Sequence, residues 1–365
     1  MTTYKTSEWV SPGHPDKVAD YISEYILDRF IERDPFTRYA LEVQIKDYHV
    51  SLAGEVTSCA EANEQSIKKW VKQAINKIGY TKEYAKRFGP DKAICGDKVK
   101  VDMYISRQSP DISQGVNTDA WGDQGIFFGY FCRETDKGHG IDYDMARKIG
   151  MYFYNVAKKM EKPIGLDIKT QVTISMEDTG EYEVKEIIVA IPTIEDEISN
   201  SQLRNYVKKT IKEMFPAADE AKIIVNGTGS YHIHGPIGDS GTTGRKLAVD
   251  FYGSRSRIGG GSPWTKDGTK ADLTLNIFAY EMAKRYYEDL KADISGLHHV
   301  ETELSCCIGQ RAVRMFVTAY DENGVPMYQT IEEENIKPSV LINKYHLNEP
   351  RYADMCINGL FSVVE

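Results

Sequence analysis

The sequence predicts an α+β protein built from three similar βαββαβ-type units, each a sheet covered by helices on one face. The chain has 365 residues, of which 41% are hydrophobic, enough for two or three domains with a sizeable buried core. Segments with helical and strand periods recur in the same order three times: a helix, a hairpin and a second helix, with further strands around them. The residues themselves do not repeat, so the triplication lies in the pattern of elements. We expect the units to span residues 1–112, 113–232 and 233–365.

The first unit opens with an amphipathic helix. Apolar residues recur at every fourth position from Val18 to Phe30, which predicts a helix over 16–33. Pro15 suits the first turn of this helix, and an Asp-Pro pair ends it. The other elements expected in this unit are a hairpin at 39–46 and 49–57, a helix at 61–78 that ends at Gly79, and a strand at 99–105.

The second and third units repeat this order. The second is expected to contain a strand at 125–133, a helix at 143–160, a hairpin at 167–176 and 182–191 with the turn 177–180, a helix at 197–214 and a strand at 222–225. The third is expected to contain a strand at 246–252, a helix at 271–290, a hairpin at 300–308 and 312–320, and a helix at 331–342. Each third therefore supplies strands for one sheet and helices to cover it.

The composition argues against several classes of function. The net charge is −9 and the isoelectric point is near 5.5, which disfavours broad electrostatic adhesion to nucleic acid or anionic membranes. No apolar run approaches the ~20 residues of a membrane span, and the polar start of the chain lacks the apolar region of a signal peptide. None of the six cysteines forms a Cys-x-x-Cys pair, so we expect reduced thiols and no structural metal on them. A cytoplasmic enzyme is the expected class.

Loop segments that combine glycine with charge carry the chemistry. They are 13–17 (Gly-His-Pro-Asp-Lys), 122–125 (Gly-Asp-Gln-Gly), 167–171 (Asp-Ile-Lys-Thr-Gln), 238–246 (Gly-Asp-Ser-Gly-Thr-Thr-Gly-Arg-Lys) and 259–272, which runs from a triple glycine to Lys-Asp-Gly-Thr-Lys-Ala-Asp. Glycine lets backbone amides approach phosphate oxygens. Lys and Arg neutralise phosphate charge, and Asp can hold Mg²⁺ whose other ligands are water and phosphate oxygens. The sequence therefore predicts an ATP-consuming enzyme whose polyphosphate is held by scattered loops.

Most of these segments, taken singly, also have a simpler explanation. Segment 13–17 alone is more typical of a turn and helix N-cap, Asp123 of a turn residue, and Lys169 of a solvated strand face. The triple glycine suits a hinge as well as a lid, whereas 238–246 favours anion binding even alone. Their joint occurrence favours a phosphate site. No Walker A pattern, strand-linked Gly-x-Gly-x-x-Gly, nucleophile elbow or His-Glu-x-x-His is present, so standard kinase and dinucleotide-binding interpretations fail.

In order along essentially the whole chain, these segments resemble the loops of the S-adenosylmethionine synthetase (methionine adenosyltransferase) family. The match also takes in Gly54-Glu55 and residues 108–112 (Gln-Ser-Pro-Asp-Ile). The resemblance implies three α+β domains related by pseudo-threefold symmetry. It also implies homodimers, often paired into homotetramers, with active sites between subunits.

The resemblance implies a transferase that joins L-methionine to ATP. In the family reaction the thioether sulfur attacks C5′ of the ribose, and the displaced triphosphate is hydrolysed to pyrophosphate and phosphate before release. A neutral thioether is already a nucleophile, so no general base is required. Cations aimed at the leaving triphosphate are then the main catalytic device.

The resemblance also implies a role for each site residue. The catalytic, triphosphate-binding residues would be His14, Lys169, Arg245, Lys246 and Lys266. Further ATP-binding residues would be Asp167, Ser230, Tyr231, Asp239 and Ser262, with the Tyr231 ring against adenine. Methionine would be oriented by Glu55, Gln108, Asp123, Asp239 and Lys270. Asp16 and Asp272 would hold two Mg²⁺ ions and Glu42 would help to bind K⁺. No nucleic-acid or membrane partner is implied.

Two alternatives stay open on the sequence. One is a phosphotransferase that acts on the γ-phosphate. The other is an inactive paralogue that binds ATP or S-adenosylmethionine, which the retained charged residues disfavour. The chain departs from the family where Ala-Phe-Ser-Gly after the triple glycine becomes Ser-Pro-Trp-Thr at 262–265. Because Pro263 fixes φ and Trp264 enlarges the ring, we expect a different substrate range or loop mobility.

Overall fold

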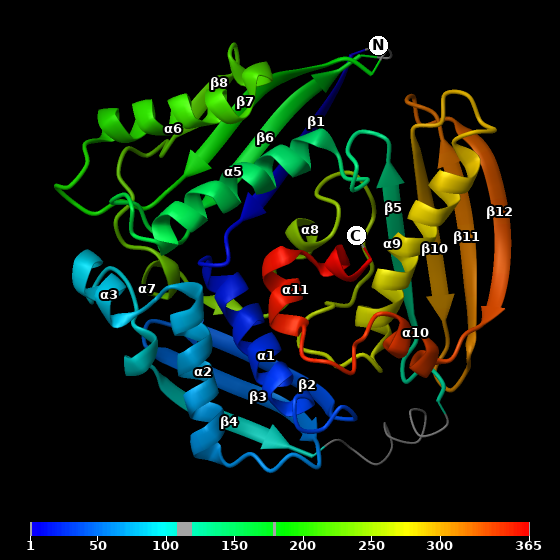
Figure 1. Cartoon of the computed structure of the whole chain (residues 1–365), viewed down its shortest axis with the longest axis horizontal. Coiled ribbons are helices and arrows are strands. Elements are labelled where there is room, and N and C mark those ends of the chain that lie inside the picture. The colour runs from blue at the N-terminus through cyan, green and yellow to red at the C-terminus, as the bar shows by residue number, and fades with distance from the viewer. Residues whose placement is uncertain (1, 108–118, 178–179, 365) are drawn as a thin grey trace.

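The computed structural model describes residues 2–107, 119–177 and 180–364. It contains three four-stranded sheets, which lie at the periphery with helices α1, α8, α9 and α11 between them (Figure 1). The three-unit α+β architecture expected from the sequence is confirmed. Among the described helices, none is long and apolar enough to cross a membrane.

The N-terminal sheet has the strand order β4-β3-β2-β9. Its strands are β2 (Arg38–Lys46), β3 (His49–Thr57), β4 (Lys100–Ser106) and β9 (Gly241–Thr242). Apolar side chains at alternate positions of β2, such as Leu41 and Val43, are buried, as expected for a strand with one face on the core. The covering helices are α1 (Pro15–Ile31), which contacts β2 and β9, and α2 (Glu64–Ile78), which packs on α1. The predicted hairpin and both predicted helices of this unit are confirmed.

The central sheet has the strand order β1-β6-β7-β8. Its strands are β1 (Thr3–Val10), β6 (Lys169–Met176), β7 (Tyr182–Ala190) and β8 (Lys222–Val225). Helix α5 (Ile141–Lys158) packs on β1 and β6, and α6 (Asn200–Met214) packs on β8. The predicted hairpin, helices and final strand of this unit are confirmed, while the turn predicted at 177–180 lies partly outside the described residues.

The C-terminal sheet has the strand order β12-β11-β10-β5. Its strands are β5 (Gly125–Cys132), β10 (His299–Cys306), β11 (Ala312–Tyr320) and β12 (Pro326–Asn335). Helix α9 (Ala271–Leu290) packs on β5 and β10 and has the bounds predicted from the sequence.

Each sheet includes a strand that comes from far away in the sequence. Strand β1 pairs antiparallel with β6, so that Thr3 lies opposite Met176. Strand β5 pairs with β10, and the two-residue strand β9 pairs with β2. The expectation that each third of the chain supplies the strands of one sheet is therefore wrong for β1, β5 and β9, each of which joins the sheet of another unit. This strand exchange depends on contacts remote in the sequence, which local patterns do not reveal.

The strand predicted at 246–252 is wrong, because Leu247–Asp250 forms the short helix α8. The segment is apolar at most positions, and a short apolar run does not distinguish a strand from a buried helical turn. Its geometry is set instead by tertiary contacts: the Asp250 carboxylate accepts hydrogen bonds from Lys17 Nζ at 2.5 Å and Trp264 Nε1 at 2.8 Å.

The helix predicted at 331–342 is also wrong over its first half. Residues 331–335 belong to β12, and α10 (Pro338–Lys344) begins only at its proline. The Glu-rich run at 332–334 favours a helix by propensity, but Tyr328, Thr330 and Glu332 are half-buried at alternate positions and pair with β11. Cross-strand pairing outweighs local propensity at this edge.

The remaining elements are short, and the sequence did not predict them. They are the helices α3 (Lys82–Phe88), α7 (Gly235–Gly238) and α11 (Tyr352–Asn358) and the 3₁₀ turns Gly96–Lys98, Pro216–Ala218 and Leu360–Val363. Helix α11 packs on α1, so the end of the chain supports the helix on which the site begins.

Candidate active site

The N-terminus of α1 is held against the central unit by a close backbone approach. A Cβ atom on Gly13 would lie 2.4 Å from the carbonyl oxygen of Leu166, so only glycine fits there. His14 is the N-cap residue: its Nδ1 accepts the N–H of Asp16 at 3.2 Å, and Pro15 occupies the first turn. The predicted helix start is confirmed.

The His14 imidazole is neutral at physiological pH. Burial, followed by the charges of Lys169 and Lys246, lowers its pKa to about 3. Because Nδ1 accepts a hydrogen bond, the proton resides on Nε2, which leaves an N–H donor for an anionic ligand.

Four carboxylates of α1 form one buried line along the helix, which we call the acidic line. They are Asp16, Asp20, Glu24 and Asp28, all less than 9% exposed. Their spacing of four residues places them on one helical face. The first three accept backbone N–H groups from distant loops: Asp16 from Thr242 (2.9 Å), Asp20 from Gly244 (2.9 Å) and Glu24 from Thr265 (2.6 Å). Asp28 accepts the N–H groups of Tyr352 (2.9 Å) and Ala353 (3.0 Å) at the start of α11. The acidic line therefore fixes the two glycine-rich loops, 238–246 and 259–272, to α1.

The same two loops dock side by side on the edge of β2. In the first loop, Thr242 pairs with Gln44, and in the second, Lys266 forms an antiparallel bridge with Ala40. A Cβ on Gly244 would lie 3.0 Å from the Ser262 side chain, so the loops also touch each other. Strand β2 and helix α1 thus hold both loops from two sides.

One cluster of charge gathers at the start of α1. We call His14, Asp16, Lys169, Arg245 and Lys246 the His14 group. Lys246 Nζ lies 2.6 Å from one carboxylate oxygen of Asp16, and Arg245 lies 3.7 Å from the other. Burial alone would raise the pKa of Asp16, but the Lys246 hydrogen bond and the backbone N–H from the neighbouring loop outweigh it and lower that pKa. The Arg245 side chain is 56% exposed, so the group has cationic capacity left for a ligand.

A buried carboxylate extends this group toward α7. Asp167 Oδ2 accepts hydrogen bonds from the Tyr231 hydroxyl at 2.7 Å and from the N–H of Gly235 at 2.9 Å. Its Oδ1 is buried and has no hydrogen-bond partner within the described residues. Burial raises the pKa of Asp167, and the nearby charge of Asp239 raises it further. The free oxygen can accept a hydrogen bond from a nucleotide.

A second cluster lies around the start of α9. We call Asp123, Lys266, Lys270 and Asp272 the Lys266 group. Lys266 is ion-paired with Asp272, and a Cβ on Gly261 would lie 2.0 Å from the Asp272 carboxylate. The Cys306 thiol donates to the backbone carbonyl of Asp123 at 3.4 Å. Burial, together with the charges of Asp123 and Asp272, raises the pKa of this thiol to about 12. Lys270 precedes α9, and its Nζ lies 3.2 Å from Asp267 Oδ2.

The predicted site residues thus form two groups in one chain. Among the described residues, no hydrogen bond or ion pair joins the His14 group directly to the Lys266 group. Glu42 lies between them on β2 and accepts hydrogen bonds from the hydroxyls of Thr243 and Thr265.

Three other predicted residues are not drawn into either group. Glu55 lies on β3 opposite Ala40, and its side chain has no hydrogen bond or ion pair to any described residue. Ser230 is exposed, and Ser262 Oγ accepts the backbone N–H of Trp264 at 3.2 Å within its own loop. Gln108 falls outside the described residues.

Trp264 anchors its loop in the core and does not line the charged surface. Its side chain is 1% exposed, its Nε1 donates to Asp250, and Lys17 Nζ lies 4.6 Å from the ring centroid. The substitution of Trp and Pro in this loop therefore changes the buried anchor. The sequence analysis gave no role to Asp20, Glu24 or Asp250. The signal available for the first two was acidic residues that recur every four positions in a largely apolar helix.

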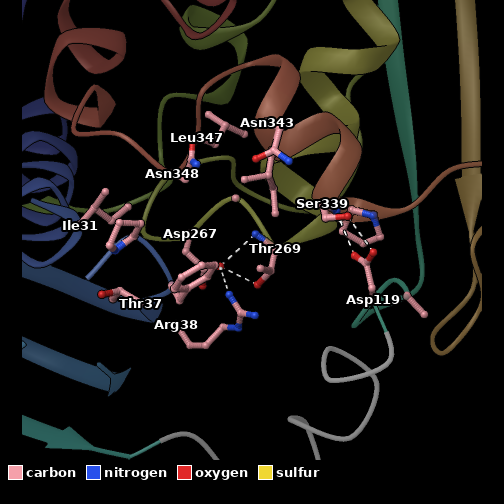
Figure 2. A pocket seen from close by; sticks show the side chains of 16 residues that line it. Ile31, Thr37, Arg38, Asp119, Asp267, Thr269, Ser339, Asn343, Leu347 and Asn348 are labelled. Carbon is pink, nitrogen blue, oxygen red and sulfur yellow. Dashed lines mark hydrogen bonds and ion pairs between the residues drawn. The ribbon is translucent and has the colours of Figure 1, made fainter. Parts of the chain in front are cut away.

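A cavity of about 260 Å³ borders the second loop without including either charged group. Figure 2 shows its lining, with Asp267 hydrogen-bonded to Thr269 and facing Arg38, whose NH1 lies 3.9 Å from the Asp267 carboxylate. Its other labelled walls include Ile31, Leu347 and Ser339. The cavity is adjacent to the loop that carries Lys270, but the charged chemistry lies elsewhere.

The donor set fits magnesium that arrives with a polyphosphate. The described residues contain no cluster of three or more His, Cys, Asp or Glu side chains that could hold a metal ion. Asp16 and Asp272 instead stand in different groups, each beside a lysine. Mg²⁺ commonly binds through one or two carboxylates plus phosphate oxygens and water, which matches this arrangement. Glu42 and its two threonine hydroxyls are oxygen donors suited to K⁺.

Comparison with known families gives matches over almost the entire chain. Three models match in order: the N-terminal, central and C-terminal domains of S-adenosylmethionine synthetase, at residues 2–110, 118–231 and 233–365. Among curated proteins, the S-adenosylmethionine synthase of Pseudothermotoga lettingae is 34% identical over 98% of this chain and 93% of its own length. That of Granulibacter bethesdensis is 33% identical over 98% and 91%.

A solved structure is similar over the same length. It is described as the structure of an unusual S-adenosylmethionine synthetase from Campylobacter jejuni. Its TM-score is 0.84 and its sequence identity 30%, and the match covers 98% of this chain and 94% of that one. The likeness therefore extends to the arrangement of all three units.

Proposed function

The chain belongs to the S-adenosylmethionine synthetase family and makes S-adenosylmethionine from ATP and methionine, and we propose that the His14 and Lys266 groups carry this reaction. The observation that supports this assignment most directly is the His14 group. It sets three cations and a neutral imidazole N–H against a single carboxylate at the N-terminus of α1. Helix N-termini attract anions, so this end of α1 suits a polyphosphate.

The reaction proceeds by attack of the methionine sulfur on C5′ of the ATP ribose. The C5′–O bond breaks, the sulfur becomes a sulfonium, and the electron pair leaves on the triphosphate, which is hydrolysed to pyrophosphate and phosphate. The sulfur needs no deprotonation, so the barrier lies in expelling a highly charged leaving group. Lys169, Arg245, Lys246 and Lys266 stabilise that charge, and His14 Nε2–H donates near the breaking bond.

Magnesium would be held by Asp16 and Asp272 and potassium with the help of Glu42, and these ions would neutralise part of the triphosphate charge when bound. Asp16 and Asp272 each pair with a lysine here. The same lysines then have to turn toward phosphate oxygens when a cation takes the carboxylate. This exchange keeps the local charge balanced between the free and loaded enzyme.

The nucleoside and the amino acid occupy opposite ends of the site. The buried, unpartnered Asp167 Oδ1 accepts from the adenosine part, with the Tyr231 ring beside adenine and Asp239, Ser230 and Ser262 near it. Methionine is oriented by Glu55, Gln108, Asp123 and Lys270. Lys270 stands at the start of α9, where it can meet the methionine carboxylate.

The site is completed by self-association. Leu41 and Val43 of β2 are buried and Glu42 between them is exposed, so Glu42 and its neighbours face away from the helices. Tyr104 on β4 is 70% exposed and offers an aromatic contact on this sheet to a second copy. A symmetric dimer across this face brings the Lys266 group of one chain to the His14 group of the other.

Product analysis tests the proposed reaction. The protein is incubated with ATP, methionine, Mg²⁺ and K⁺, and the products are weighed by mass spectrometry. We expect S-adenosylmethionine, pyrophosphate and phosphate in equal amounts. Accumulating ADP would instead indicate γ-phosphate transfer, and ATP binding without product would indicate the inactive paralogue, which no finding favours.

A complementation experiment tests the shared site. His14→Asn and Lys266→Met chains are each expected to be inactive when expressed alone. If each site takes its two groups from two chains, co-expression restores about a quarter of the sites, because half the dimers are mixed and each has one intact site. If both groups come from the same chain, the mixture stays inactive.

A further inference from the structure

We propose that Glu24 is a positioning residue: by holding the backbone of Thr265 in a left-handed conformation, it aims Lys266 at the leaving triphosphate. This inference rests on the role proposed above for Lys266. It concerns a residue on the inner side of α1 that touches neither substrate nor the charged groups.

Thr265 has an unusual backbone conformation. Its φ is +73°, a region that glycine adopts freely and that β-branched residues avoid because of Cβ clashes. The residue is 1% exposed and lies directly between the buried ring of Trp264 and the half-exposed Lys266. Strain of this kind persists only where surrounding groups impose it, and it concentrates at functional sites.

Three hydrogen bonds to two elements, α1 and β2, impose the Thr265 conformation. Its N–H donates to Glu24 Oε1 at 2.6 Å, its carbonyl accepts the N–H of Leu41 at 3.2 Å, and its hydroxyl donates to Glu42 Oε1 at 3.1 Å. The bonds to β2 secure one side of the residue. Glu24, from α1, secures the other.

The left-handed turn at Thr265 lets the side chains on either side of it, Trp264 and Lys266, point in different directions. Before it, Trp264 points into the core to meet Asp250 and Lys17. After it, Lys266 bridges to Ala40 and its side chain is 21% exposed and faces Asp272. Without the left-handed turn at Thr265, the Lys266 side chain, which follows the buried Trp264 directly, would not point toward Asp272.

Glu24 accepts the Thr265 hydrogen bond through one carboxyl oxygen, Oε1. It is fully buried, and its Oε2 has no hydrogen-bond partner within the described residues. Burial raises the pKa of the Glu24 carboxyl well above its ordinary value, and the charges of Asp28 and Asp20 add to this against the opposing Lys17. The printed contact of the Glu24 carboxyl is the hydrogen bond from the Thr265 N–H, and a glutamine side-chain oxygen can also accept it.

The test combines variants of Glu24 with a glycine at position 265. We expect Glu24→Leu, which removes the acceptor, to lower kcat at least tenfold while the KM for methionine changes less than threefold. Glu24→Gln should keep kcat within threefold of wild type. In the Thr265→Gly background the left-handed conformation carries no steric cost, so Glu24→Leu should there lower kcat less than threefold.

The same tenfold loss in both backgrounds would overturn the proposal, as would a Glu24→Gln variant as impaired as Glu24→Leu. Wild-type product formation is measured first, so a failure of the proposed function shows itself separately. A crystal structure of Glu24→Leu gives a readout independent of activity. The φ of residue 265 should leave the positive region, and an unchanged φ with lost activity would also overturn the proposal.

Two further variants control for misfolding and for a general loss of stability. If Glu24→Leu does not fold, Glu24→Asp withdraws the acceptor by one methylene, and the same comparison between backgrounds applies. Asp28→Asn alters the same acidic line, but its partners are Tyr352 and Ala353 of α11. It should lower the melting temperature and leave kcat within twofold in both backgrounds.

Discussion

The His14 group and the cluster around Arg255 both combine arginine with a buried carboxylate but differ in how completely their charges are paired. Arg255 donates to Glu134 at 2.7 and 2.9 Å and to Asp142 at 2.9 and 2.6 Å, and Ser7 donates to Asp142 at 2.7 Å. The three charged side chains are at most 4% exposed. In the His14 group, by contrast, Arg245 is 56% exposed and Asp16 is its nearest carboxylate partner.

The difference separates a structural cluster, Arg255 with Glu134 and Asp142, which we call the Arg255 lock, from the proposed binding site. A buried charge whose hydrogen bonds all go to other side chains cannot also bind a ligand. Removing it lowers the stability of the fold, because its partners are left buried and unpaired. A cluster with exposed cations costs the fold less and keeps its capacity for substrate. Pairing, more than residue type, therefore indicates which cluster is functional.

The largest effect should come from breaking the lock. Arg255→Met leaves two buried carboxylates without their cation, so we expect the free energy of unfolding to fall by about 3–5 kcal/mol. The kcat of the folded protein should change less than twofold. Urea unfolding and turnover at low temperature measure the two quantities, and a large loss of kcat without a loss of stability would reverse the assignment of this cluster.

The next largest effect should come from a partly exposed lysine of the proposed site, Lys266. Lys266→Met removes a leaving-group cation, and we expect kcat to fall by about 10²–10³-fold. The melting temperature should change by no more than about 2 °C, because the lysine is partly exposed. Turnover close to wild type would remove Lys266 from the mechanism.

Acid should weaken the lock through Glu134. Burial alone would raise its pKa, but the hydrogen bond from His298 and the charge of Arg255 lower it to about 2. A depressed carboxyl pKa adds stability that is present above the unfolded value near 4.5 and is lost as pH falls toward about 2. The contribution is at most about 3 kcal/mol. Between these pH values, Glu134→Gln should show a flatter unfolding free energy than wild type; parallel curves would contradict this.

The smallest effect should come from the anchor beneath the second loop. Trp264→Phe removes the indole donor to Asp250, and we expect about 1 kcal/mol less stability with kcat within threefold. Trp121→Phe is the matched control, because the Trp121 indole N–H is buried and has no partner within the described residues. The control should lose less stability in the same urea titration, and an equal loss would show that ring volume matters more than the hydrogen bond.

Local patterns in the sequence predicted most of the helices and hairpins. Helix α9 and strand β8 have the predicted bounds, because amphipathic period, turn residues and helix caps act over a few neighbouring positions. The pairing of β1 with β6 and of β5 with β10 was not predicted, since strand exchange depends on contacts remote in the sequence. Strand β12 was missed for the same reason: pairing with β11 decides its state, and its Glu-rich run has the opposite propensity.

For the candidate site, the sequence motifs predicted which residues take part but not which of them form hydrogen bonds or ion pairs with one another. The sequence motifs predicted that these loops share one polyphosphate site. In the structure, Asp16 lies beside Arg245 and Lys246, and Lys266 lies beside Asp272. The roles of these residues stay predictions. The acidic line was not predicted, because acidic residues at helical spacing are equally typical of a solvent-exposed helix face. Their burial depends on the loops that donate hydrogen bonds to them, and those loops are remote in the sequence.

The pairing of β1 with β6 has a consequence for the order in which the protein is made. Thr3 pairs with Met176 and Val10 with Lys169, so the first strand finds its place only after about half of the chain has left the ribosome. His14 follows β1 by a few residues, and Gly13 closes against Leu166. The N-terminal end of α1 therefore forms late, and contacts of such high sequence separation slow folding. A nascent chain arrested before residue 169 should leave its N-terminal strand open to protease, while one extended past β7 should protect it.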